Sequence, residues 1–162
     1  MVEFPSTYTG QLRIDDRGIL SAINQVSFEK VKRMYIVENF NTDTIRAFHG
    51  HKIEEKQALV VSGSALVILA EMVDDKEKDF GSAPSFLTSP NGYLSEPTRS
   101  ILSSRNPTLL TIPAGWANGF RALEPNTKVL FFSSTTLDEA KEDDYRFSFN
   151  YFGEEIWETE NR

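Results

Sequence analysis

Short segments of alternating apolar and polar residues, separated by polar turns, run along most of the chain. In Lys30–Val37, KVKRMYIV, residues 31, 33, 35 and 37 fall on one face of an expected strand and residues 32, 34 and 36 on the other, because successive side chains of a strand point to opposite faces. Similar spacing, interrupted by turn residues, predicts an all-β sandwich or small barrel. The expected strands are Gly10–Ile14, Gly18–Ile23, Lys30–Val37, Thr44–His49, Gln57–Val61, Ser64–Ala70, Thr98–Ser103, Thr108–Ile112 and Lys128–Ser134.

Two segments depart from this pattern. Asp74–Asn91 is rich in charged residues, Ser, Gly and Pro, and is typical of a long loop or insertion. Leu137–Asp144, LDEAKEDD, is the best helix candidate, with one or two turns. No repeat or linker divides the 162 residues, a length typical of one domain. We therefore expect a single domain over residues 1–162.

The charge balance and the missing cysteines narrow the range of functions. Lys and Arg total 17 against 24 for Asp and Glu, a formal charge of −7, which disfavours nucleic-acid binding and anionic membrane surfaces. Without cysteine there are no disulfides, thiolate nucleophiles or thiolate metal sites. The longest apolar run, Ala65–Ala70, is far shorter than the roughly 20 residues of a membrane span. Since the N-terminus also shows no secretion signal, we expect a cytoplasmic protein that binds neither nucleic acid nor membrane.

Both histidines of the chain lie in one tripeptide, His49-Gly50-His51. On a strand, residues i and i+2 point to the same side, so the two imidazoles are expected to enter one space. Imidazole has a pKa of about 6.5, which suits proton transfer near neutral pH. The pair can act as a general base and a general acid, or as two metal ligands with Glu55 as a third. A solvent-facing pair without a role is the remaining alternative.

Two motifs resemble those of the cupins. The spacing His49-x-His51-x3-Glu55, followed by Gly63, is similar to the first cupin motif, and Pro113–Asn118, PAGWAN, is similar to the second. Asn118 stands where metal-binding cupins have a ligand histidine. The resemblance therefore implies no bound metal and no cofactor.

Longer stretches resemble the RmlC-like cupins that act on nucleotide sugars. Arg46–Lys52, RAFHGHK, resembles the Arg-Gly-Phe-His-Ala-His-Lys motif of the dTDP-sugar 3,4-ketoisomerases, and Asp16–Leu20 and Asp144–Arg146 resemble two further segments of that group. Leu110–Phe120, LTIPAGWANGF, is similar to the dTDP-4-dehydrorhamnose 3,5-epimerases. The resemblance implies a cupin jelly roll (a double-stranded β-helix barrel) with a short C-terminal helical segment. It also implies a homodimer whose partner is a nucleotide-sugar substrate.

The resemblance also implies roles for particular residues. The expected reaction moves the ketone of a nucleotide-linked 4-keto-6-deoxy sugar between C4 and C3. His49 is the expected base at C3, His51 protonates C4 or relays a proton from oxygen, and Tyr35 donates to the enolate oxygen. Arginine pairs well with phosphate oxygens. The residues expected to contact the substrate are Arg33, Arg46, Lys52, Asn118 and Arg121.

Several departures keep other functions open. Phe131 stands where the epimerases have a tyrosine that acts as the acid. Because Phe131 has no hydroxyl, a 3- or 3,5-epimerase is the second hypothesis. Lys56 replaces a glutamine of the ketoisomerases, Asn118 replaces a histidine, and residues 73–100 have no counterpart. These differences favour, as a third hypothesis, a cupin that binds a sugar nucleotide without converting it. A metal-dependent oxygenase ranks last.

Overall fold

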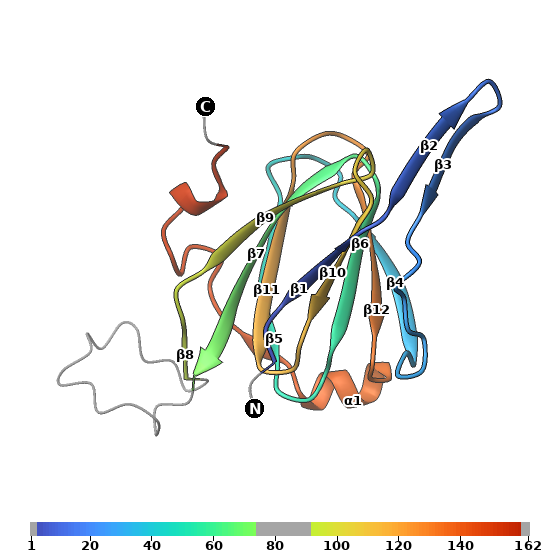
Figure 1. Cartoon of the computed structure of the whole chain (residues 1–162). Helices are drawn as coiled ribbons and strands as arrows, with labels where there is room; N and C mark the ends of the chain where they lie inside the picture. Colours follow the sequence, from blue (N-terminus) through green and yellow to red (C-terminus); the bar gives the residue numbers. More distant parts are fainter. Residues whose placement is uncertain (1–2, 74–91, 160–162) are drawn as a thin grey trace.

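Two antiparallel sheets face each other across an apolar core in the computed structural model, which describes residues 3–73 and 92–159 (Figure 1). The first sheet consists, in spatial order, of β1 (Ser6–Thr9), β10 (Thr108–Ile112), β6 (Lys56–Ser62), β12 (Lys128–Ser133) and β4 (Arg33–Glu38). The second sheet consists of β13 (Tyr145–Arg146), β5 (Ile45–His51), β11 (Trp116–Ala122), β7 (Ser64–Val73) and β8 (Tyr93–Leu94), and β9 (Thr98–Ser103) also pairs with β7. The all-β prediction is confirmed.

The apolar core follows from the alternation of side chains along the strands. On β7, residues 65, 67 and 69 join the core between the sheets, whereas residues 66, 68 and 70 pack on the opposite face against Phe48, Phe147 and Trp157. The second sheet is therefore buried on both faces, which explains the uninterrupted apolar run at Ala65–Ala70. On β4 the predicted alternation is confirmed, because residues 33, 35 and 37 are half-buried and residues 34, 36 and 38 are exposed.

Two further elements extend from this body. The hairpin of β2 (Gln11–Asp15) and β3 (Gly18–Ala22) projects outward, and α1 (Leu137–Glu142) lies at one end of the sandwich (Figure 1). A capping box between Thr136 and Glu139 starts α1. A 3-10 turn, η2 (Glu155–Trp157), follows near the C-terminus. Among the residues described, no helix is long and apolar enough to span a bilayer.

All nine expected strands are present, β9 and β10 with the predicted ends and the others with ends shifted by a few residues, and the helix predicted at Leu137–Asp144 ends two residues earlier. The strands β1, β8, β11 and β13 were not predicted. The loop expected at Asp74–Asn91 lies outside the described residues, and the single domain over 1–162 stays a prediction.

Candidate active site

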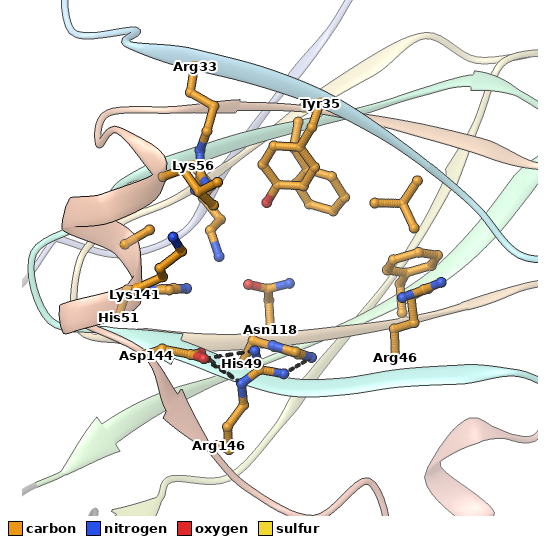
Figure 2. A pocket seen from close by; sticks show the side chains of 15 residues that line it. Arg33, Tyr35, Arg46, His49, His51, Lys56, Asn118, Lys141, Asp144 and Arg146 are labelled. Carbon is orange, nitrogen blue, oxygen red and sulfur yellow. Dashed lines mark hydrogen bonds and ion pairs between the residues drawn. The ribbon is translucent and has the colours of Figure 1, made fainter.

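A cavity of about 520 Å³ opens between the two sheets at the end where α1 lies (Figure 2). Its volume falls in the range of roughly 300–1,000 Å³ that is usual for small-molecule sites. The first sheet contributes side chains from β4, β6 and β12, the second from β5, β11 and β13, and α1 covers one end. The lining residues are Arg33, Tyr35, Val37, Arg46, His49, His51, Lys56, Asn118, Phe120, Phe131, Leu137, Ala140, Lys141, Asp144 and Arg146.

Both imidazoles line this cavity, as their spacing predicts. Gly50 between them faces the other side of the sheet, where a β-carbon would clash with Met72. On β11, the register partner of His49 is Asn118. The side chain of Asn118 points into the cavity (Figure 2), and its Oδ1 is buried with no hydrogen-bond partner among the described residues. A ligand hydroxyl group would satisfy that acceptor.

An arginine and an aspartate adjoin the ring of His49. Arg146 Nη1 lies 3.2 Å from His49 Nε2, and Arg146 pairs with Asp144 through contacts of 2.7 and 2.8 Å (Figure 2). Burial first, and then the charge of Arg146, lower the pKa of His49 to about 4. His49 is therefore neutral at pH 7 and has the charge state that a general base requires.

A fully buried carboxylate, Glu54, holds several polar side chains of the site. Its oxygens accept from Arg33 Nη2 at 2.7 Å and from the Ser133 hydroxyl, and lie 3.0 Å from His51 Nε2 and 3.4 Å from Lys56 Nζ. Burial alone raises the pKa of Glu54, but the contacts with His51, Lys56 and Ser133 outweigh it and hold the pKa well below 4.5. Glu54 is thus the anion that compensates the buried cations.

Lys56 brings an ammonium group into the cavity from the start of β6. Its side chain is only 7% exposed. Burial lowers the pKa of Lys56, and the charge of Glu54 opposes that effect. A cation in such a poorly solvated position stabilises a developing oxyanion more strongly than it does in water.

The segment that follows β5 is held by the end of α1. Asp143 is buried, and its carboxylate accepts hydrogen bonds from the backbone N–H groups of Lys52, Ile53 and Glu54 at 2.8–3.1 Å. These bonds place the Glu54 side chain beside His51. Glu55, the carboxylate considered as a third metal ligand, instead pairs with the exposed side chain of Lys30.

Tyr35 lies on the wall opposite His49, because β4 belongs to the first sheet and β5 to the second (Figure 2). Its ring stacks on Phe131 at a centroid distance of 5.1 Å, and the Arg33 guanidinium lies 5.2 Å from its centroid. Burial, followed by the charge of Glu54, raises the pKa of Tyr35 to about 12. At neutral pH the hydroxyl therefore keeps its proton and can donate a hydrogen bond.

Several solved structures have a fold similar to that of this chain. A mutant of the QdtA 3,4-ketoisomerase from Thermoanaerobacterium thermosaccharolyticum, solved with TDP-4-keto-6-deoxyglucose, is similar with a TM-score of 0.64 and 18% identity over 93% of each chain. The dTDP-4-dehydrorhamnose 3,5-epimerase from Bacillus anthracis, with TDP and PPi bound, has a TM-score of 0.64 and 23% identity over 90% of this chain and 79% of its own.

A third structure, the 3'-monoepimerase ChmJ from Streptomyces bikiniensis with dTDP-quinovose, has a TM-score of 0.69 and 14% identity over 90% of this chain and 70% of its own. The fold is that of the RmlC-like cupins. The predicted cupin jelly roll is thereby confirmed. No family model matches the chain, and no curated protein matches its sequence.

Six of the eight predicted site residues line the cavity: Tyr35, His49, His51, Arg33, Arg46 and Asn118. Arg46 donates from Nε to the neutral side chain of Asn39 at 2.7 Å. The other two residues lie elsewhere. Lys52 places its ammonium 5.2 Å from the centre of the Tyr145 ring, and Arg121 donates to the carbonyls of Thr42 and Trp157.

Sequence reasoning assigned no role to the charged residues Lys56, Glu54, Lys141 and Arg146. Lys56 carried a signal as a departure from the ketoisomerase pattern, and Arg146 as part of a matching segment. Over residues 3–73 and 92–159, no group of three or more His, Asp or Glu side chains is arranged to hold a metal ion. The absence of metal and cofactor stays a prediction.

Proposed function

We propose that this chain is an isomerase that moves the ketone of a nucleotide-linked 4-keto-6-deoxy sugar between C4 and C3. The observation that carries the proposal is the convergence of His49, His51 and Lys56 on one sugar-sized cavity. The similarity in fold to enzymes whose structures contain TDP or TDP-sugars supports the substrate class.

The chemistry starts with the hydrogen on C3, which the neighbouring ketone makes acidic. His49 takes this proton, and the electrons of the broken bond form a C3–C4 double bond while the ketone oxygen becomes negative. The Lys56 ammonium and the protonated Tyr35 hydroxyl both line the cavity and stabilise that oxygen. The groups need no rearrangement to do so, because Glu54 already holds Lys56 within 3.4 Å.

Completion of the reaction returns one proton to carbon. The former ketone oxygen gains a proton while the C3 hydroxyl loses one, and C4 receives a proton from His51. The ketone then stands at C3, and the sugar has gained or lost no atom. Glu54 orients His51 through its contact with Nε2, and the two imidazoles restore their protonation states by exchange with water.

Binding of an anionic nucleotide by a chain with a net charge of −7 requires local cations. Five basic side chains line the cavity, from Arg33, Arg46, Lys56, Lys141 and Arg146. Salt screens the acidic remainder within roughly 8–10 Å. Of the five, Arg46 has a neutral partner, Asn39, among the described residues, so we assign it to the diphosphate.

Incubation with dTDP-4-keto-6-deoxyglucose in D2O tests the reaction. The expected result, followed by NMR and mass spectrometry, is a 3-keto product with deuterium at C4, and deuterium at C3 in the 4-keto sugar that the reverse reaction forms. His49→Asn should reduce the rate about 10²–10⁴-fold while it keeps nucleotide affinity. Arg105→Gln, which removes an exposed pair with Glu124 outside the cavity, serves as control. Absence of both exchange and 3-keto product rejects the proposal for this substrate.

A 3- or 3,5-epimerase is the second candidate, and the position of Tyr35 favours it. Phe131 has no hydroxyl, but Tyr35 stacks directly on it and offers one from the wall opposite His49. An acid and a base on opposite sides of the sugar ring are what inversion at a carbon requires. The same D2O experiment distinguishes the reactions, because epimerisation leaves the ketone at C4. Nucleotide binding without any exchange would favour a catalytically silent cupin.

We also propose that the chain forms a homodimer, as the resemblance to the RmlC-like cupins implies, and that it acts in the cytoplasm. The projecting β2–β3 hairpin supports the dimer, because it exposes apolar side chains that a second copy would bury. Ile14, Ile19 and Leu20 are 70%, 68% and 58% exposed.

A further inference from the structure

Arg146 contacts one of the two ring nitrogens of His49, and a neutral imidazole has a free lone pair on only one of them. In the register between β13 and β5, Arg146 lies opposite His49, and its Nη1 is 3.2 Å from Nε2. A guanidinium group can only donate hydrogen bonds. Nε2 must therefore accept with its lone pair, which leaves the hydrogen of the neutral ring on Nδ1. In this arrangement Nε2 cannot take a proton from a substrate carbon.

The contact that blocks Nε2 is built from exposed, exchangeable side chains. The side chain of Arg146 is 62% exposed and that of its partner Asp144 is 28% exposed. Exposed ion pairs contribute little to stability, so a change of partner disturbs the fold little. A diphosphate is a stronger partner for a guanidinium than a single carboxylate, since it carries more negative charge.

We propose that Arg146 locks His49 in the free protein and that the diphosphate of a bound nucleotide draws Arg146 away, which frees Nε2 to accept the proton. The inference rests on the proposed function for its ligand. Arg146 is a positioning residue here, because it acts through His49 and takes no part in the chemistry. Such a lock would prevent His49 from acting as a base until a nucleotide is bound.

The lock predicts a change in the protonation of His49 on binding. Four charged or titratable groups surround this ring: Arg146 on β13, Lys56 on β6, His51 on β5, and Asp144, which directly precedes β13. When Arg146 leaves, the ring loses one cation and keeps Asp144 nearby, so its pKa rises from the low value of the free protein. A like charge at this distance typically accounts for about one pH unit or more.

Imidazole 15N NMR of the full-length protein tests the lock, because the chain has only two histidines and His51→Asn assigns their signals. Wild type without ligand should show neutral His49 with the hydrogen on Nδ1. Saturation with thymidine diphosphate should remove this preference and raise the pKa of His49 by about one pH unit. Arg146→Gln should show the raised pKa before ligand is added and a smaller further rise with ligand. Arg146→Lys should behave between the two.

Several results would overturn the lock. The hydrogen on Nε2 in the free wild type would do so, as would an unchanged His49 in Arg146→Gln. Calorimetry on the same samples separates the two proposals. If thymidine diphosphate binds and His49 does not respond, the lock is wrong and the proposed function stands. If thymidine diphosphate does not bind, both are wrong for thymidine nucleotides. Arg105→Gln, an exposed arginine paired with Glu124 outside the cavity, should match wild type in every measurement.

Discussion

Glu54→Gln keeps the size of a buried side chain and removes its charge. Glu54 is fully buried, and the side chains of Arg33 and Lys56 beside it are only 20% and 7% exposed. The substitution therefore leaves two poorly solvated cations without the anion that compensates them. Removing one partner of a buried ion pair costs roughly 3–5 kcal/mol. Lys56 can lose its proton and relieve part of this penalty, since burial already lowers its pKa, so we expect about 3 kcal/mol.

Urea denaturation followed by fluorescence measures this loss. With a slope of about 2 kcal/mol per molar urea, the midpoint should fall by roughly 1.5 M. Glu55→Gln is the matched control, because the neighbouring carboxylate is only half-buried and, among the described residues, pairs with an exposed lysine, Lys30. It should leave the midpoint almost unchanged. A loss below about 1 kcal/mol in Glu54→Gln, or equal losses in the two variants, would refute the assignment of Glu54 as the central anion.

The stabilising contribution of Glu54 should also depend on pH, in a direction that its lowered pKa determines. Because the folded-state pKa of Glu54 lies below its ordinary value of 4.5, the unfolded chain takes up a proton first as the pH falls. The stabilising contribution of the carboxylate is therefore complete above about pH 4.5 and is lost progressively below it. The difference in unfolding free energy between wild type and Glu54→Gln should shrink in that acidic range. A difference that grows below pH 4.5 would contradict the direction of the shift.

Three other predictions concern activity, binding and assembly. The pKa of His49 is about 4, so the kcat/KM for C3 exchange should stay constant as the pH falls from neutral and should decrease only near pH 4. A decrease centred near pH 6.5 would argue against a buried neutral base. Arg46→Gln should weaken thymidine diphosphate binding at least about tenfold by calorimetry, with Arg105→Gln unchanged; equal affinities would remove Arg46 from the nucleotide site. Ile14→Lys combined with Ile19→Lys should give a monomer by light scattering, and a persistent dimer would place the interface elsewhere.

Strands could be predicted from the sequence where apolar and polar residues alternate regularly. They could not be predicted where pairing with neighbouring strands, and not the strand's own residues, causes the burial. β4 alternates with a period of two, and its two faces came out as expected. β11 was missed because Ala117, Asn118 and Gly119 are weak strand formers. Pairing with β5 on one side and β7 on the other buries all three residues. Such a strand depends on its neighbours, and its own residues carry little local signal.

In the site, too, features that depend on neighbouring residues could be predicted, whereas features that depend on residues distant in the sequence could not. The shared direction of His49 and His51 is a local property of a strand, so spacing predicted it. The choice between Glu54 and Glu55 depends on Asp143, which is about ninety residues away in sequence and binds the backbone from Lys52 to Glu54. Arg146 likewise reaches His49 only through the pairing of β13 with β5. No spacing rule reports contacts of this kind.

The arrangement around Tyr35 limits what can separate the two candidate reactions. Tyr35 and Phe131 are register partners on β4 and β12, and both face the cavity. With a pKa of about 12, the Tyr35 hydroxyl is a proton donor at neutral pH and cannot act as a base. In either reaction it can stabilise the same enolate oxygen, and His49 removes the same C3 proton. The outcome then depends on the carbon that receives a proton next. His51 lies two residues from His49 on the same strand face, so delivery from His51 to C4 yields the shifted ketone, whereas delivery from the opposite wall to C3 yields the epimer.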